Sequence, residues 1–363
     1  MPETMRILVT GAAGLIGGEI ASRLVRRGHW VSALVHRNSE VRGNDGSTPS
    51  LHVVLAGDVT RPDLGLDADA AADHELLIHC AATTRFDLTD EAYRATNVVG
   101  TANAIGVAQA SGMAFLHVST AYVCGKRSGS IREDDPLPTT GFANGYEASK
   151  AAGEQLVANS GLRWAIARPS VVVGHSGSGA IRTFDTIYAA FKLIAEGRVR
   201  HMAATEDATI DFVPIDHVAA GIVALAEDMR AAHGRRYHLV SSQPVPVATF
   251  AGAIGSYPQF NAPSLMPPDV FDPAVLPPLE RRLYGRVASL YSSYFQRDPR
   301  FDDARFRALT GLVCPPTGPA YLKRLIDYCI AVGFLSGGAD QASRSGVKGS
   351  ASEGSNPVSA GSR

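Results

Sequence analysis

The chain has few cysteines, almost no net charge and no long apolar run. Its four cysteines are scattered over 363 residues, and none forms a C-x-x-C pair or lies beside histidines at metal-ligand spacing. We therefore expect no metal site and no disulfide framework. Lysine plus arginine (34) nearly balance aspartate plus glutamate (35), without a basic stripe. This charge pattern argues against nucleic acid or a membrane surface as partner and favours a small molecule.

The longest apolar stretches fall short of the roughly 18 residues that a membrane-spanning helix needs. The N-terminus runs into an apolar strand and a glycine-rich turn, without the design of a signal peptide. We therefore expect a cytoplasmic protein with no membrane span. The hydrophobic content of 45% is enough for a large core, and the sequence leaves a homodimer open.

From Arg6 to about Arg168, short β-branched runs alternate with helix-length amphipathic stretches. This alternation predicts an α/β protein with a Rossmann doubly wound parallel sheet. The predicted strands are Arg6–Thr10, Trp30–His36, His52–Ala56, Leu76–Ala81, Ala114–Ser119 and Trp164–Arg168, and the clearest predicted helices are Leu15–Arg27, Glu91–Ser111 and Tyr146–Asn159. Near-continuous apolar runs are what buried parallel strands require.

After Arg168 the pattern loosens. Helices are expected at Ile181–Glu196 and Asp216–Asp228, and strands at Thr209–Ile215 and Arg236–Val240. Helical spacing returns at Leu279–Gln296 and Pro319–Gly333. We interpret the aromatic and apolar stripes of these last two segments as core packing. We divide the chain into a Rossmann dinucleotide-binding core (1–170), mixed segments that complete the core and form a substrate-binding lobe (171–335), and a disordered tail (336–363). The tail is rich in Gly and Ser and has hardly any large apolar residue.

A glycine-rich turn joins the first strand to the first helix. Glycines in such a turn let backbone N–H groups approach a diphosphate and let the helix pack closely. The run is Thr10-Gly11-Ala12-Ala13-Gly14-Leu15-Ile16-Gly17, in which we assign cofactor binding to Gly11, Ala13, Gly14, Leu15, Ile16 and Gly17. The alternative is a purely structural glycine turn.

The end of the second strand indicates which dinucleotide is bound. A carboxylate about twenty positions after the glycines binds the ribose of NAD, whereas an arginine accommodates the 2′-phosphate of NADP. Here the strand ends Val35-His36-Arg37 without an acid, which favours NADPH, with a solvated surface charge as the alternative for Arg37. Asp58 and Val59 follow the third strand, where they would bind the adenine, or Asp58 would cap the next turn.

The run Tyr146-Glu147-Ala148-Ser149-Lys150 is the most informative stretch for chemistry. A separation of four residues puts the phenol and the ammonium on one helix face, one turn apart. We expect the cation to lower the pKa of Tyr146 from about 10 toward working pH, so that the tyrosine exchanges a proton with an oxygen whose carbon exchanges a hydride. Such a pair is also a frequent accident of helices.

Ser119 and Thr120 end the preceding strand at the carboxyl edge of the sheet, where open α/β sheets bind ligands. From about Arg6 to Asp216 the sequence resembles the extended short-chain dehydrogenase/reductase superfamily. Three features match that superfamily in order and spacing: the glycine pattern, this hydroxyl pair and the Tyr-x-x-x-Lys run. The resemblance implies that the protein is an NAD(P)-dependent oxidoreductase with Thr120 as the catalytic hydroxyl and Ser119 as its neighbour or substitute.

The resemblance also implies roles for other residues. Lys150 would bind the nicotinamide ribose, and Asn97 would support the site from the next helix, although a helix cap is an equal alternative. The end of the fourth strand and the Arg-Pro turn after the sixth strand would line the cofactor with Ala81, Ala82, Thr83, Pro169 and Val171.

Within the superfamily, three features resemble the fatty acyl-CoA reductase and thioester reductase branch, which is related to male-sterility proteins. They are the sequence from Val118 to Val123, the sequence from Asn144 to Ala151, and the apolar, Pro-rich C-terminal part. The resemblance implies NADPH-dependent reduction of an apolar or polyketide-like acyl thioester, bound to CoA or a carrier protein. The sequence departs from that branch in having no carrier or adenylation domain. Reduction of a ketone, or oxidation of a secondary alcohol, by the same residues is the main alternative.

Two further alternatives stay open. Sugar epimerisation is disfavoured because the second lobe lacks an evident basic cluster for a nucleotide diphosphate, yet Arg281, Arg282 and Arg286 keep it open. A non-catalytic dinucleotide-binding regulator could dispense with Thr120 and Tyr146, which this sequence retains.

Overall fold

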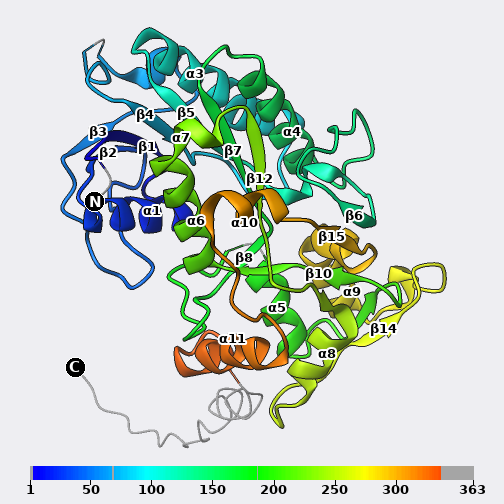
Figure 1. Ribbon diagram of the computed structural model, residues 1–363. Helices are drawn as coiled ribbons and strands as arrows, with labels where there is room; N and C mark the ends of the chain where they lie inside the picture. Colours follow the sequence, from blue (N-terminus) through cyan, green and yellow to red (C-terminus); the bar gives the residue numbers. More distant parts are fainter. Residues whose placement is uncertain (1–2, 68, 186, 337–363) are drawn as a thin grey trace, which may run out of the picture.

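A computed structural model describes residues 3–67, 69–185 and 187–336 (Figure 1). Nearly all of the tail that the sequence predicts to be disordered lies outside the described residues. Among the described residues, a seven-stranded sheet has the order β12-β7-β5-β4-β1-β2-β3, and every neighbouring pair is parallel. Its strands are β1 (Arg6–Thr10), β2 (Trp30–Val35), β3 (Val53–Ala56), β4 (Leu76–His79), β5 (Ala114–Val118), β7 (Trp164–Pro169) and β12 (Arg235–Leu239).

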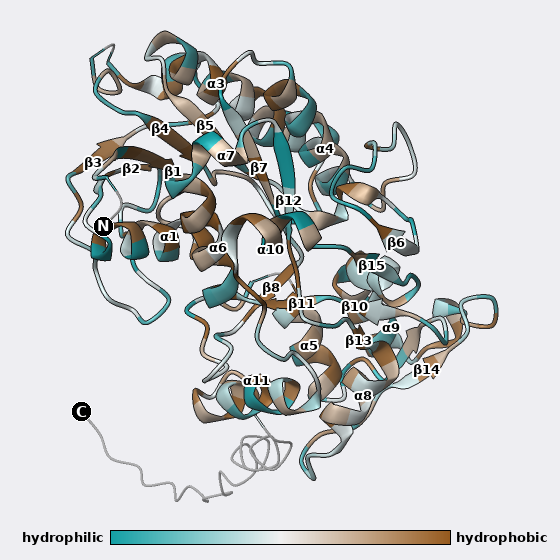
Figure 2. Ribbon diagram, viewed as in Figure 1, coloured by the Kyte–Doolittle hydropathy of each residue, from teal (hydrophilic) through white to brown (hydrophobic). Residues whose placement is uncertain are grey.

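The predicted α/β class with a doubly wound parallel sheet is confirmed. The central strands are apolar and almost fully buried, as a parallel sheet covered on both faces requires. Figure 2 shows them brown, whereas β12 is teal along much of its length. The sequence of β12, RRYHL, therefore carries a weak strand signal, although its register beside β7 completes the sheet.

Helices cover both faces of the sheet. On one face α1 (Leu15–Arg26) and α6 (Ile215–Glu227) share a core, to which Ile20 and Ile222 contribute. On the other face α3 (Gly100–Ala110) and α4 (Gly145–Ala158) share a second core with Ala104 and Val157. Four-residue helices α2 (Asp90–Tyr93) and α7 (Met229–Ala232) lie beside these layers.

A third apolar core forms a lobe below the carboxyl edge of the sheet in the view of Figure 1. Its helices are α5 (Ile187–Ala195), α8 (Val247–Gly255), α9 (Pro278–Arg286), α11 (Pro319–Ala331) and the 3₁₀ helix Ala288–Phe295, and α10 (Ala304–Thr310) lies against β12. Outside the main sheet the described residues form short strand pairs: β8 (Val171–Val173) with β11 (Phe212–Pro214), β6 (Gly129–Ile131) with β15 (Pro299–Phe301), β9 (His201–Ala203) with β14 (Ser264–Met266), and β10 (Thr209–Ile210) with β13 (Val245–Pro246). None of the helices described is both long and apolar enough to cross a membrane.

Four predicted elements differ from the structure. The helical stretch expected at Leu279–Gln296 is divided at Val287 into α9 and the 3₁₀ helix Ala288–Phe295. The helix expected at Ile181–Glu196 is α5, which begins only at Ile187, because tertiary hydrogen bonds hold the preceding backbone: Arg182 N donates to Asn44 Oδ1. The strand expected at Thr209–Ile215 is divided at the buried Asp211 into β10 and β11. The helix expected at Glu91–Ser111 contains a wider π-helical turn at Arg94–Val99.

Candidate functional site

The glycine-rich turn lies between β1 and α1. Gly11 has a φ of +68°, and a Cβ there would come within 2.6 Å of the backbone nitrogen of Ala81. A Cβ on Gly17 would lie 2.3 Å from the carbonyl oxygen of Gly11. Helix α1 starts without a side-chain cap and without an acid in its first turn, so its first N–H groups remain available to an anion. These features fit the diphosphate of a dinucleotide.

A cavity of about 350 Å³ extends from this turn across the carboxyl ends of the central strands. It reaches from the glycines to Thr120 and Tyr146 and then to the 3₁₀ helix Ala288–Phe295. The lining residues are Gly11, Gly14, Leu15, Ile16, Gly17, Cys80, Ala82, Thr84, Phe86, Ser119, Thr120, Tyr122, Tyr146, Pro169, Ser170, Val171, Val172, Asp185, Ile187, Tyr291 and Tyr294. The structure thus brings the predicted glycines and the predicted hydroxyl groups to one continuous site.

Tyr146 and Thr120 face each other at the middle of this cavity. Asn144 caps α4 by accepting a hydrogen bond from Glu147 N at 2.9 Å, which fixes Tyr146 in the first turn. Burial raises the pKa of Tyr146 above its usual value, and the hydroxyl of Thr120 partly offsets the rise. The expectation that Lys150 lowers this pKa is wrong for the structure described here. The tyrosine is therefore a protonated phenol over the whole neutral range.

Lys150 lies one turn further along α4 but points beneath the cavity. Its Nζ donates a 2.8 Å hydrogen bond to the carbonyl oxygen of Val118 and lies 3.3 Å from Nε2 of His117. Lys150 is almost fully buried, and burial lowers its pKa to about 8. It does not line the cavity of 350 Å³.

Ser119 lines the cavity, whereas Asn97 occupies a supporting position. The buried Ser119 hydroxyl has no hydrogen-bond partner among the described residues, and it contributes less than Arg168 to lowering the pKa of the neighbouring Glu154. Asn97, in the π-helical turn, accepts from Thr83 N at 2.8 Å and donates to Ser149 Oγ at 2.9 Å. It is buried and caps no helix; it ties the loop after β4 to α4.

The loop after β4 presents alternate residues to the cavity, as extended chain does. Ala82 faces the cavity, with Cys80 and Thr84 on the same side, whereas Ala81 and Thr83 point away. Pro169 and Val171 line the cavity where β7 meets β8. Of the glycine-turn residues assigned to cofactor binding, Ala13 lies outside the cavity lining and packs against the core.

The residues assigned to the adenosine end lie beyond the cavity, at the ends of β2 and β3. Arg37 is exposed and has no ion-pair partner within the described part of the chain. Oδ1 of Asp58 accepts from Thr60 N at 2.9 Å and from its hydroxyl at 2.7 Å, so the carboxylate caps its own turn. Val59 packs toward α3, where a Cβ on Gly100 would touch its side chain.

Sequence reasoning missed an aromatic wall, which consists of Phe86, Tyr291 and Tyr294. The Phe86 and Tyr294 rings are stacked with centroids 5.8 Å apart, and the ring of Phe86 lies 5.6 Å from that of Tyr146. The sequence pattern alone favours core packing for the aromatic residues near 290. No sequence signal ties them to Phe86, because about two hundred residues separate them.

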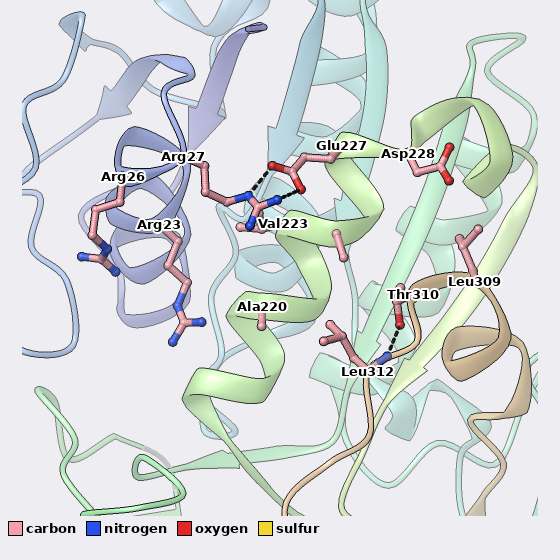
Figure 3. Close-up of a pocket in the computed structure, with 11 residues that line it drawn as sticks. Arg23, Arg26, Arg27, Ala220, Val223, Glu227, Asp228, Leu309, Thr310 and Leu312 are labelled. Carbon is pink, nitrogen blue, oxygen red and sulfur yellow. Dashed lines mark hydrogen bonds and ion pairs between the residues drawn. The ribbon is translucent and has the colours of Figure 1, made fainter. Parts of the chain in front are cut away.

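Figure 3 shows a different hollow, of about 870 Å³, at the C-terminal end of α1. Its arginines are already paired: Arg27 donates to Glu227 at 2.7 Å, and Arg23 donates to Glu19 at 2.7 Å. It lies at the end of α1 opposite the glycine turn and contains none of the predicted catalytic residues. Elsewhere, the described residues include no cluster of three or more side chains suited to hold a metal ion.

Comparison with known proteins gives one family and several relatives. The family described as male sterility protein matches residues 9–222. The chain is 27% identical over 266 residues to a 3β-hydroxysteroid dehydrogenase/Δ5→4-isomerase of Mycobacterium tuberculosis, covering 69% of this chain and 68% of the relative. It is 29% identical over 256 residues to the 4-hydroxy-2-methyl-3-oxo-4-farnesyl-3,4-dihydroquinoline-1-oxide ketoreductase of Stigmatella aurantiaca, covering 68% and 71%.

Among solved structures, the terminal R domain of the myxalamid PKS-NRPS biosynthetic pathway is similar to the chain. The two share a TM-score of 0.77 and 24% sequence identity, and the match covers 93% of each chain. At this level of identity the likeness establishes the fold, including the lobe below the sheet.

Proposed function

The chain belongs to the male sterility protein family and is an NAD(P)-dependent oxidoreductase of the extended short-chain dehydrogenase/reductase type, and we propose that it uses NADPH to reduce a carbonyl group. The carbonyl group belongs to an acyl thioester or a ketone on a neutral apolar substrate. The observation that carries this proposal is the cavity beside Tyr146. Its lining includes the aromatic wall, Leu15 and Ile187, and no lysine or arginine from the part of the chain described.

The charge of the cavity decides between substrate classes. At the end of the cavity away from the glycine turn, no lysine or arginine of the described residues lines the wall, so burying the diphosphate of a nucleotide sugar there would be strongly unfavourable. Arg281, Arg282 and Arg286 lie on α9 and do not line the cavity, which argues against sugar epimerisation.

Thr120 and Tyr146 supply the polar end of the site. A substrate carbonyl between them would accept a hydrogen bond from each hydroxyl, which stabilises the negative charge that develops on oxygen. Tyr146 then gives that oxygen its proton as a general acid. Its raised pKa suits this direction, because the phenol keeps its proton at neutral pH.

The reduced nicotinamide supplies the hydride when it is bound. We assign its diphosphate to the glycine turn and its nicotinamide end to the Pro169–Val171 side of the cavity. We assign the 2′-phosphate of NADPH to Arg37, an exposed guanidinium whose fork of N–H groups matches phosphate. We assign Lys150 and Asn97 as positioning residues that hold α4 in place, since neither side chain lines the cavity.

A thioester and a ketone need the same carbonyl site and differ in the step after hydride addition. With a thioester, hydride addition and protonation are succeeded by departure of thiol, which leaves an aldehyde. With a ketone, the product is a secondary alcohol. The fold shared with a PKS-NRPS terminal domain supports a thioester, and the relatives named ketoreductase and steroid dehydrogenase support a ketone or alcohol.

The test is loss of NADPH absorbance with a panel of purified substrates. The panel contains medium-chain acyl thioesters of pantetheine, the same acyl groups on CoA, apolar aldehydes and ketones, and a nucleotide sugar, with mass spectrometry of the products. We expect turnover of the neutral carbonyl compounds and none of the nucleotide sugar. Aldehyde released together with thiol would identify thioester reduction.

Two outcomes would overturn the proposal. Conversion of the nucleotide sugar alone would make the chain an epimerase. Tight NADPH binding without turnover of any carbonyl compound would make it a non-catalytic dinucleotide-binding protein.

A further inference from the structure

Arg182 belongs to the lobe but reaches the glycine turn. Its Nη2 donates a 2.9 Å hydrogen bond to the carbonyl oxygen of Gly14, the residue at which α1 begins. The rest of its side chain is half-buried, and its Nε is shielded from solvent without a hydrogen-bond partner in the described residues. A buried N–H group of this kind costs free energy until an acceptor is supplied.

The position of Arg182 is fixed by its neighbours. Asn44, in the loop after β2, accepts a hydrogen bond from Arg182 N at 3.0 Å and donates one to the carbonyl oxygen of Ala180 at 3.0 Å. Asn44 N in turn donates to the buried carboxylate of Glu19 on α1 at 2.6 Å. These three contacts hold the backbone of Arg182 beside the first turn of α1 before any ligand arrives.

The backbone N–H groups in the first turn of α1 have no side-chain cap. Gly14 provides no side-chain cap, and no acid lies in the first turn. The partial positive charge at the helix N-terminus and the guanidinium therefore meet at one place. Among the described residues no carboxylate forms an ion pair with Arg182, although Asp185 lies close enough for the guanidinium to oppose the rise that burial causes in its pKa. Such an arrangement is unfavourable by itself and becomes favourable when an anion binds.

We propose that Arg182 is a further binding residue for the cofactor and holds the dinucleotide diphosphate against the N-terminus of α1. The inference rests on the proposed function in requiring a dinucleotide, and it assigns this diphosphate contact to a residue of the C-terminal lobe. The diphosphate is common to NADH and NADPH, whereas the contact assigned to Arg37 concerns the 2′-phosphate alone. The two arginines therefore make different predictions for the two cofactors.

The experiment measures dissociation constants of NADPH and NADH by isothermal titration calorimetry, with no substrate present. Arg182→Ala should weaken both cofactors by a similar factor, about tenfold or more, because one charge-assisted hydrogen bond to phosphate is lost. Arg182→Lys keeps the positive charge and should recover part of the affinity. Arg27→Ala is the matched control, since it removes one arginine directly after the C-terminal end of α1 (Figure 3).

The outcomes separate this inference from the proposed function. If the wild-type chain binds neither dinucleotide, the proposed function is wrong and the role of Arg182 is wrong with it. If the wild type binds and Arg182→Ala has unchanged affinities, even with a lower melting temperature, Arg182 is only a structural tie between lobe and turn. Weakening of NADPH alone would assign Arg182 to the 2′-phosphate and overturn the inference.

Discussion

The ammonium group of Lys150 donates a hydrogen bond of 2.8 Å to the carbonyl oxygen of Val118, at the end of the strand that delivers Thr120. The lysine thus links α4 to β5 beneath the cavity. Its charge is buried, and burial lowers its pKa to about 8 from 10.5. The first two predictions concern Lys150 and Tyr146, which lie one turn apart on α4.

Lys150→Met should change how stability depends on pH. In the wild type the folded state releases the Lys150 proton near pH 8 and the unfolded chain near 10.5, so between these values the unfolded state binds more protons. The wild type should therefore gain stability relative to Lys150→Met as pH rises through that window, with no such trend below about pH 8. Urea unfolding of both proteins at about pH 7 and about pH 9.5 measures the difference. A difference that is constant, or that moves the other way, would contradict the lowered pKa.

Tyr146→Phe should lower turnover by about a hundredfold or more, because it removes the general acid and keeps the ring. NADPH affinity should change little, since only one hydroxyl is lost. The control is Tyr237→Phe, which removes a hydroxyl that donates to Ala232 O at 3.2 Å, far from the cavity. Turnover is measured by NADPH absorbance and affinity by calorimetry. Retention of most of the turnover by Tyr146→Phe would mean that another group protonates the substrate.

Arg37→Ala should narrow a preference for NADPH over NADH. The side chain is exposed at the end of β2, and we expect its loss to weaken NADPH about tenfold or more while NADH is unaffected. Both dissociation constants are measured for wild type and variant. Equal affinity of the wild type for the two cofactors would remove the basis of the NADP assignment.

Phe86→Ala should raise KM for flat apolar carbonyl substrates by about threefold to tenfold, which corresponds to one lost aromatic contact. The kcat should fall less, because Thr120 and Tyr146 keep their places. Small aliphatic aldehydes, which have no ring to stack on the aromatic wall, serve as the internal control. If KM rises equally for small and large substrates, Phe86 does not contribute to substrate selection.

Local patterns were sufficient to predict the core of this fold. Near-continuous apolar runs identified the strands from Arg6 to Arg168, and the glycine turn identified the start of α1. The strand β12 was recognised near its observed bounds, but its charged sequence gave no reason to place it at the edge of the main sheet.

The candidate site was predictable only where its residues are close in sequence. A spacing of four residues placed Tyr146 and Lys150 on the same helix, yet it could not reveal that Lys150 turns toward Val118, because that direction depends on the packing of α4 against β5. The aromatic wall and the contact between Arg182 and Gly14 join segments far apart in the chain. Only tertiary structure brings such residues together.

Arg297 and Glu147 provide the last prediction, because they join the catalytic helix to the aromatic wall. Nη2 of Arg297 donates to Oε1 of Glu147 at 2.6 Å, and both side chains are buried. The guanidinium lies between the rings of Tyr122 and Tyr294, 4.8 and 4.7 Å from their centroids. One buried ion pair therefore holds three elements around Tyr146.

Arg297→Met should lower the free energy of unfolding by about 3 to 5 kcal/mol, because it leaves the carboxylate of Glu147 buried without its cation. Adding Glu147→Gln removes that charge, so the double variant should recover part of the loss. Urea unfolding of the wild type, both single variants and the double variant gives the coupling between the two sites. If the ion pair contributed nothing, the losses of unfolding free energy in the two single variants would add up to the loss in the double variant. The aromatic wall would then be held by ring packing alone.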